Sequence, residues 1–370
     1  MQFLQNRPTS FEALSKTLVD DSFVVKTQGS LYLVTNPRGY PNPENDSVRR
    51  QLRGVILEKE TNKIVAYGLD HDIEVRSEKD LQDLPYYCFD PEINEMVVED
   101  AIDGTLIRMY YYNNQWNYAT NRCIDASKSF WVSERSFKDL FLEAAERCSL
   151  DTNLLNKHCT YTFVLCHPEN RNVKKYSFPS IYHIGTRLNN TQETDHSIGI
   201  QAPKSYEFDS WESILQRANE LPFFQEGFIV KVYVSNMIYR IKVVNKKFTD
   251  VHAIKGNHRN PAIHYVSTVR IMGQDAIDRY LKYFPEHTAI FASTEALIRS
   301  TISYLHKEYI NFFVDHSRTQ IDPVAYKVLS MLHSRYKETQ EKTTKEVIAE
   351  VVGTLDNEGP VTLAALLGLN

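Results

Sequence analysis

The spacing of the apolar residues changes once along this chain of 370 residues. Between residues 22 and 248, short runs rich in Val, Ile, Tyr and Phe are separated by Asn, Gly, Asp and Pro, the pattern of strands joined by turns. The pair Asn113-Asn114 lies between two such runs and predicts the tip of a hairpin. From about Gln274 the apolar residues recur at helical spacing. We therefore expect a mainly antiparallel β region followed by an all-helical region.

A few helices are expected around the strands, so the predicted fold class is α+β. Residues 11–18 are amphipathic, Ser133 is the expected cap of a helix that reaches Ala145, and Ser210 is the expected cap of another. In the helical region, Asp322 followed by proline predicts a helix start.

The expected domains are 1–258 and 259–370, with the boundary in the polar stretch 255–264. The first would hold the antiparallel sheets and the second only helices.

Composition limits the classes of protein that this chain can belong to. A net charge of −5 and a pI near 6.2 argue against a protein that coats nucleic acid non-specifically. The five cysteines form no CxxC pair and predict reduced thiols. No apolar run approaches the ~20 residues of a membrane span, so we expect a soluble, cytoplasmic protein without a membrane partner. The Walker pattern is absent, which disfavours a P-loop kinase.

The residues that indicate chemistry form an ordered series of short motifs, each at the end of a strand-like run. In chain order these are Arg53-Gly54, Ala101-Ile102-Asp103-Gly104-Thr105, Thr120-Asn121-Arg122, the segment 163–171 (FVLCHPENR), the segment 226–231 (EGFIVK) and Arg240-Ile241-Lys242.

This series resembles the covalent nucleotidyltransferase superfamily of ligases and capping enzymes, and most of all the phage-type RNA ligase 1 group. The resemblance covers roughly residues 50 to 250. In that superfamily the first motif is Lys-x-Asp-Gly, a later one is Glu-Gly followed by apolar residues and Lys, and the last is Lys-x-Lys. One such motif is weak, but five in order are specific.

The resemblance implies a role for each matching residue. Ala101 stands at the position of the lysine that attacks ATP, and Lys231, Arg240 and Lys242 would act in catalysis by stabilising charge on phosphorus. Nucleotide-binding residues would be Arg53, Asp103, Gly104, Arg122, Phe163, Glu226, Lys231 and Lys242. Glu226 and Asp103 would bind Mg²⁺, for which Mn²⁺ could substitute.

Three departures from the family pattern qualify this interpretation. Ala101 cannot form a lysyl-adenylate, Arg240 replaces a lysine, and Val164 stands where many relatives have a glutamate. Natural decay and an engineered substitution both explain Ala101. We favour engineering, because the phosphate-binding cations and Glu226 are retained.

Each motif alone also has an ordinary structural interpretation. Asp103-Gly104 is more often a turn than a site, and Arg53 or Arg122 alone is usually a solvated strand residue. Lys231 and Lys242 would equally suit an exposed strand face.

The expected parent activity is ATP-dependent RNA ligation, in which 3′-hydroxyl and 5′-phosphate ends are joined through lysyl-adenylate and RNA-adenylate intermediates. Expected partners are ATP and RNA, including broken tRNA or another structured RNA under repair. The helical region would either help to hold the RNA or only support the ligase domain. Two alternatives remain open: a capping guanylyltransferase, and a non-catalytic nucleotide- or RNA-binding pseudo-ligase. The helical C-terminal region disfavours the first, because capping enzymes normally carry a β-barrel there.

Overall fold

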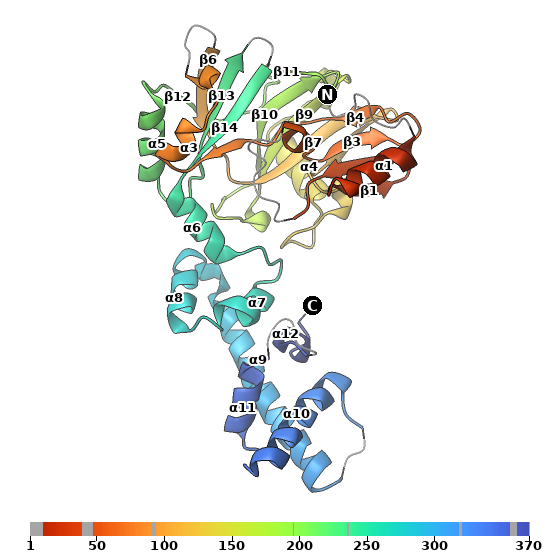
Figure 1. The fold of residues 1–370 in the computed structure, drawn as a ribbon, viewed down its shortest axis with the longest axis vertical. Helices are drawn as coiled ribbons and strands as arrows, with labels where there is room; N and C mark the ends of the chain where they lie inside the picture. The colour runs from red at the N-terminus through yellow and green to blue at the C-terminus, as the bar shows by residue number, and fades with distance from the viewer. Residues whose placement is uncertain are drawn as a thin grey trace. The chain divides into compact units, whose positions relative to one another are not determined.

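The strand-like segments form three sheets in the computed structural model, which describes residues 10–38, 47–89, 94–194, 196–234, 237–317, 320–355 and 361–369. The chain divides into two compact units, Met1–Ala253 and Ile254–Asn370 (Figure 1). The first unit holds the sheets and the second contains only helices among its described residues. The predicted α+β class is confirmed.

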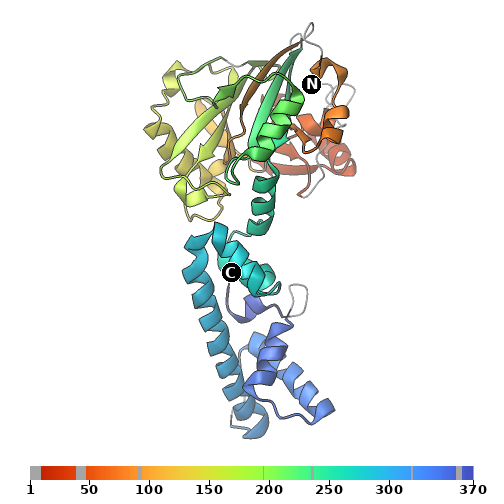
Figure 2. The same cartoon turned by 90° about the vertical axis from the view of Figure 1, so that its left-hand side faces the viewer.

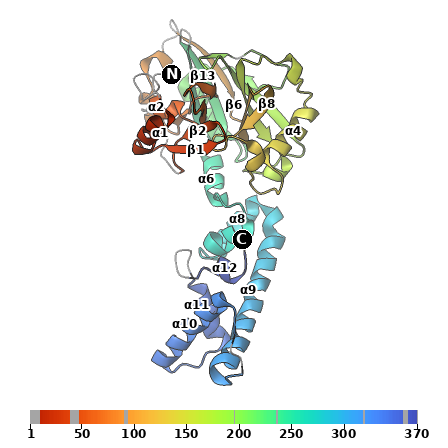
Figure 3. The same ribbon diagram turned by 90° about the vertical axis from the view of Figure 1, so that its right-hand side faces the viewer.

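The first sheet is a four-stranded antiparallel meander against which the N-terminal helix packs. Its strands are β1 (Val24–Gln28), β2 (Leu31–Thr35), β3 (Val55–Glu58) and β4 (Ile64–Ala66). Helix α1 (Phe11–Asp20) begins after Ser10, whose side chain caps it, and its buried residues Leu14 and Leu18 join a core cluster with Tyr32. Figure 3 shows α1 beside β1 and β2.

The second sheet has the order β11-β10-β9-β7-β8 and is antiparallel throughout its paired residues. Its strands are β7 (Thr105–Tyr112), β8 (Gln115–Ala119), β9 (Cys159–Cys166), β10 (Ser180–Leu188) and β11 (Gln192–Thr194). Asn113 and Asn114 form the predicted hairpin tip, with φ of 51° and 61°, the left-handed values that a tight two-residue turn requires.

Helix α4 (Phe137–Arg147) packs on this second sheet, and Phe141 and Ala144 of the helix share a core cluster with Phe163 of β9. The predicted helix is confirmed but its predicted cap is wrong. Ser136, rather than Ser133, accepts a hydrogen bond from the backbone N–H of Asp139.

The third sheet has the order β12-β6-β13-β14-β5. Its strands are β5 (Ile73–Val75), β6 (Asn94–Asp100), β12 (Ser205–Tyr206), β13 (Gly227–Val234) and β14 (Met237–Val244). All pairs are antiparallel except β5 with β14, which are parallel. Helix α5 (Trp211–Glu220), capped by Ser210 as predicted, contacts β13 and β14; Figure 2 shows it in green across that face.

Two further short α-helices lie in the first unit, α2 (Ser47–Gln51) and α3 (Glu78–Gln82). Helix α3 contacts β5 and α5, so the third sheet is covered by α3 and α5 together.

The second unit is built around the long helix α9, which contacts α10 and α11. The helices from the end of the first unit onward are α6 (Lys246–Lys255), α7 (Pro261–His264), α8 (Gln274–Tyr283), α9 (Thr288–Tyr309), α10 (Pro323–Thr339), α11 (Lys345–Gly353) and α12 (Leu363–Leu366). Asp322 caps α10 and Pro323 is its first residue, as predicted. Among the helices described, none has the length and apolar character needed to cross a membrane.

Candidate active site

Most of the predicted motifs meet around one cavity in the first unit. The cavity has a volume of about 250 Å³ and is lined by residues from the segment around Ala101, from β9 and β10, and from β13 and β14. Its charged residues are Arg53, Asp72, Glu99, Asp100, Glu226, Arg240 and Lys242. Apolar side chains, among them Ile102, Val164 and Ile229, form the rest of the wall. A wall that combines converging charged groups with apolar side chains is compatible with a small-ligand site.

Ala101 lies in the wall of this cavity, directly after strand β6. Its backbone N–H donates a hydrogen bond to the carbonyl oxygen of Gly227 at 3.0 Å, and only 7% of the residue is exposed. The backbone of this position is therefore fixed against the start of β13. A side chain longer than the methyl group would have to extend along or into the cavity.

Glu226 and Lys242 form an ion pair at the start of β13. Lys242 Nζ donates to Glu226 Oε1 at 2.7 Å. Gly227 makes the close approach of the two strands possible, because a Cβ there would lie 2.1 Å from the carbonyl oxygen of Val243 and its φ is 137°. The glycine of the Glu-Gly motif thus has a structural reason that does not depend on any ligand.

Asp72 lies between the cations of the cavity. Its Oδ2 is 3.8 Å from Nη1 of Arg53. Burial acts to raise the pKa of Asp72, but the positive charges of Arg53 and Lys242 outweigh it and hold the pKa below its usual range. Burial acts in turn to lower the pKa of Lys242, and Glu226 and Asp72 raise it above its ordinary value. Asp72 and Lys242 therefore stay charged at neutral pH.

Arg240 is held in the cavity wall by two acceptors. Its Nε donates to Glu193 Oε1 at 2.9 Å, and its Nη2 donates to the carbonyl oxygen of Ile184 at 2.7 Å. Only 4% of Arg240 is exposed. Arginine suits this position because its planar guanidinium presents several donors at once in a fixed geometry.

The cavity wall carries three cationic and four carboxylate side chains. A divalent cation prefers oxygen ligands, and Glu226 fits as one such ligand because it lines the cavity and is partly exposed. Among the described residues no group of three or more Asp, Glu, His or Cys side chains converges on one point. A metal ion held here would therefore complete its shell with phosphate oxygens or water.

Lys231 does not line the cavity, although its partner does. Its Nζ donates to Glu99 Oε1 at 2.7 Å, and the lysine is 4% exposed. The structure therefore places Lys231 behind the wall, where it fixes a carboxylate.

Asp103 also lies outside the cavity lining. Its Oδ1 accepts a hydrogen bond from Asn172 Nδ2 at 2.7 Å, and its Oδ2 accepts from the backbone N–H groups of Val173 and Lys174 at 2.9 and 2.7 Å. Only 3% of the residue is exposed. The geometry gives no support to Asp103 as a metal or nucleotide ligand, because its carboxylate already holds the segment 172–174.

Gly104 does line the cavity, and packing explains the glycine. A Cβ at this position would lie 2.5 Å from the carbonyl oxygen of Leu165 and 2.6 Å from Cγ1 of Val164. Strand β9 therefore comes too close for any other residue.

Phe163 and Arg122 are not brought to the cavity. Phe163 is fully buried in the core of the second sheet, against Phe141 and His183. Its neighbour Val164 faces the cavity instead, because successive residues of a strand point to opposite faces. Arg122 donates to the carbonyl oxygens of Asn36 and Pro37 at 3.2 Å each. The structure thus gives no support to Phe163 or Arg122 as nucleotide-binding residues.

Sequence reasoning did not assign Glu99 and Asp100, which directly precede the Ala101 motif, to the site. It also missed two residues far from any motif, Asp72 and Glu193. Asp72 precedes β5, which reaches the site only by pairing with β14. Glu193 is in β11 and reaches Arg240 across the sheets. Neither belongs to a motif, and no local pattern marks them.

No family model matches the chain. The chain is 25% identical over 367 residues to an "Immediate-early protein ICP-46 homolog" of Invertebrate iridescent virus 6, over 86% of this chain and 77% of that protein. It is 27% identical over 283 residues to a "Putative bifunctional polynucleotide kinase/RNA ligase" of Autographa californica nuclear polyhedrosis virus, over 72% of this chain and 40% of that protein. The resemblance to RNA ligases indicated by the motifs is confirmed by this second relative.

Among solved structures, an archaeal ATP-dependent RNA ligase is similar with a TM-score of 0.43 and 11% identity. The match covers 79% of this chain and 76% of that chain.

Proposed function

We propose that the cavity around Ala101 is the adenylate site of an ATP-dependent RNA ligase. The observation that supports this most strongly is that Ala101 lies in one wall with Arg53, Glu226, Arg240 and Lys242, which come from three other motifs. A lysine at position 101 would extend toward Arg53, Arg240 and Lys242. Positive charges lower the pKa of a nearby amine and so favour its nucleophilic form.

In the parent enzyme, the amine of this lysine attacks the α-phosphorus of ATP, loses a proton and displaces pyrophosphate. The AMP is then transferred to the 5′-phosphate of RNA. The 3′-hydroxyl of a second end attacks that phosphate, and AMP leaves with the bonding electrons. Lys242 and Arg53 bind phosphate oxygens and oppose the charge that develops on phosphorus.

A divalent cation, Mg²⁺ or Mn²⁺, would supply electrostatic stabilisation to the phosphates. Glu226 is the residue that we assign to it. Since Glu226 also accepts the hydrogen bond of Lys242, the two compete for the same carboxylate.

Replacing Ala101 with lysine tests the assignment. The Ala101→Lys protein is expected to become covalently labelled by ATP with Mg²⁺, and labelling by GTP instead would favour the capping-enzyme alternative. If the variant binds ATP without becoming labelled, position 101 is not the position of the nucleophile.

The chain as it stands provides a second test, because the lysine acts only as the first nucleophile. We expect the Ala101 protein to seal RNA that is already 5′-adenylylated and to leave plain 5′-phosphate RNA unjoined. A Glu226→Ala protein is the control, expected to lose sealing. Bound RNA with no joining above this control would favour a non-catalytic binding protein, the alternative that Ala101 itself suggests.

A further inference from the structure

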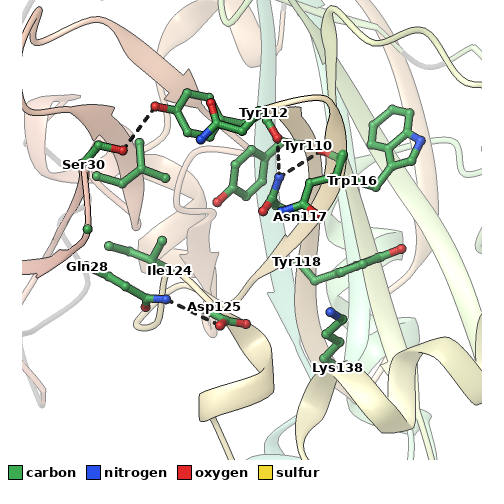
Figure 4. Close-up of a pocket in the computed structure, with 14 residues that line it drawn as sticks. Gln28, Ser30, Tyr110, Tyr112, Trp116, Asn117, Tyr118, Ile124, Asp125 and Lys138 are labelled. Atoms are coloured by element: carbon green, nitrogen blue, oxygen red, sulfur yellow. Dashed lines mark hydrogen bonds between the residues drawn. The ribbon is translucent and has the colours of Figure 1, made fainter.

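A second cavity in the first unit shares no lining residue with the candidate active site. It has a volume of about 340 Å³ and lies between the β1–β2 turn and the β7–β8 hairpin. Figure 4 shows Gln28 and Ile124 on one side, and Asn117 and Tyr118 on the other. The volume is within the range of small-ligand sites, ~300–1,000 Å³.

Aromatic and aliphatic groups form the floor of this cavity. Tyr110 is 2% exposed and Ile124 is 6% exposed, so both present only a small surface. The rings of Tyr112 and Tyr118 are half-buried at its edges. Tyr118 packs against Phe141 with ring centroids 5.4 Å apart, which fixes its orientation. The tyrosine rings offer faces against which a flat ligand can pack.

The polar groups of the rim are mainly amides. Asn117 Nδ2 donates to the carbonyl oxygens of Tyr112 and Gln115 at 3.0 and 2.9 Å, which directs this side chain. Gln28 Nε2 lies 3.4 Å from Oδ2 of Asp125. Within the described part of the chain, the amide oxygens of Asn117 and Gln28 accept no hydrogen bond, so they can serve as acceptors for a ligand. Amides of this kind read the edges of nucleobases.

The charge of the rim excludes a phosphate as the main ligand. The cavity is lined by one cation, Lys138, and one carboxylate, Asp125. The Nζ of Lys138 lies 5.6 Å from the centre of the Tyr118 ring. Phosphate sites normally gather several cationic donors, as the candidate active site does. The ligand that fits here is the base and ribose of a nucleotide, with its phosphates outside the cavity.

A third cavity, also of about 340 Å³, adjoins the second one and shares Tyr110 and Tyr112 with it. On its far side the Nζ of Lys157 lies 4.7 Å from the centre of the Tyr111 ring. Two adjoining cavities, each lined by one lysine, offer room for more than one nucleotide of a strand.

We propose that these two cavities bind unpaired nucleotides of single-stranded RNA. The inference rests on the proposed function for the choice of RNA as partner, and it places a strand-binding site on the seam between the first and second sheets. Tyr112 and Tyr118 stack with bases, and Asn117 and Gln28 accept hydrogen bonds from base amino groups or ribose hydroxyls.

Photo-crosslinking of the full chain tests this proposal. The probe is a short unstructured RNA that contains 4-thiouridine, and crosslinked peptides are identified by mass spectrometry. We expect crosslinks in residues 110–118 or 157–160. A Ser30→Trp substitution in the β1–β2 turn fills the second cavity and is expected to lower that crosslinking about tenfold, the loss typical of one displaced stacked base.

Thr61→Trp is the matched control, an exposed position in the turn between β3 and β4, and it should leave crosslinking unchanged. Gln28→Trp provides a second obstruction if the Ser30 variant unfolds on thermal melting. Crosslinks only elsewhere in the chain, or equal crosslinking in all variants, would overturn the proposal. If free uridine, at the same concentration as the nucleotides of the RNA, lowers crosslinking as much as unlabelled RNA does, the cavities bind a nucleoside and the proposal of a strand-binding site is wrong.

The sealing assay separates this inference from the proposed function. If the protein seals adenylylated RNA but gives no crosslinks at 110–118 or 157–160, the proposed strand-binding site is wrong and the proposed ligase function stands. Crosslinks there that Ser30→Trp removes, in a protein that seals nothing, support the strand site and count against the ligase.

Discussion

Glu193 Oε1 lies 2.9 Å from Nε and 2.7 Å from Nη2 of Arg240, so one carboxylate oxygen holds two nitrogens of the same guanidinium. The other oxygen of Glu193 is 3.3 Å from Nη2 of Arg187. All three side chains are less than 10% exposed. Because Arg240 lines the candidate active site, Glu193 fixes a cation of the cavity from behind.

We expect Glu193→Gln to lower the free energy of unfolding by about 3 kcal/mol, because it removes the charge of a carboxylate that two buried arginines share. Urea unfolding measures the change. The matched control is Glu220→Gln, which removes an exposed partner of Arg217 and should cost less than about 1 kcal/mol. Equal small losses in both variants would show that the buried pair is energetically no different from a surface pair.

Asp103→Asn should destabilise the protein by about 2 kcal/mol. An amide presents its NH₂ group to backbone donors that now face a carboxylate, and a buried mismatch of this kind costs ~1–3 kcal/mol. Asp151→Asn is the control, because Asp151 caps a turn from an exposed position. ATP affinity measured by calorimetry is expected to change little in Asp103→Asn. A large loss of affinity with unchanged stability would instead support direct nucleotide binding.

Gly104→Ala is expected to lower the free energy of unfolding by about 1–3 kcal/mol, the range for overpacked sites. The added Cβ would meet the backbone oxygen of Leu165, which cannot move without displacing β9. Gly353→Ala is the control, because a Cβ there meets nothing within 4 Å and the position lies in helix α11. That variant should be neutral or slightly more stable. Thermal melting compares the two.

The pKa of Asp72 predicts how stability depends on pH. The pKa is lowered in the folded state, so the contribution of Asp72 is fully present above the unfolded value, ~3.9, and is lost as pH falls through the folded value. We expect Asp72→Asn to be less stable than the unsubstituted chain at neutral pH, with a difference that shrinks in acid. Denaturant unfolding at several pH values checks this; a difference that grows in acid would contradict it.

Lys242 and Lys231 are expected to differ, although both were predicted to act on the nucleotide. Lys242→Met removes a cation from the cavity wall, and loss of a charged hydrogen bond worth ~1.5–3 kcal/mol weakens ATP binding about tenfold or more. Lys231→Met leaves Glu99 without its buried partner and should lower stability by about 3 kcal/mol. Calorimetric titration with ATP and Mg²⁺ and urea unfolding separate the effects. Equal losses of ATP affinity in the two variants would indicate that Lys231 also contacts the nucleotide.

Local patterns predicted the elements of this fold better than the contacts between them. The helical period after Gln274, the cap at Ser210 and the hairpin tip at Asn113 depend on neighbouring residues, and all three are confirmed. The cap at Ser133 was wrong because Ser136, three residues later, has the same chemistry, and which serine caps depends on where the chain turns onto the sheet.

The site was predicted in part for the same reason. The motifs name Arg53, Ala101, Glu226 and Lys242, and these four residues line one cavity. The strand period distinguishes Phe163 from Val164 only when the buried face is known, and β9 is buried on both faces. Glu193 reaches the site through tertiary contacts that no sequence period records.

Two cations of the cavity, Lys242 and Arg53, are already paired with carboxylates. An anionic ligand that enters would therefore take the place of these carboxylates. At the proposed adenylate site, a polyphosphate would have to replace Glu226 at Lys242 and Asp72 at Arg53. The displaced carboxylates then become available to a cation that arrives with the polyphosphate. Because opposite charges enter together, few small ions are taken up or released. The affinity should therefore vary only weakly with ionic strength. A purely basic groove would differ, because binding there releases the counterions of the ligand.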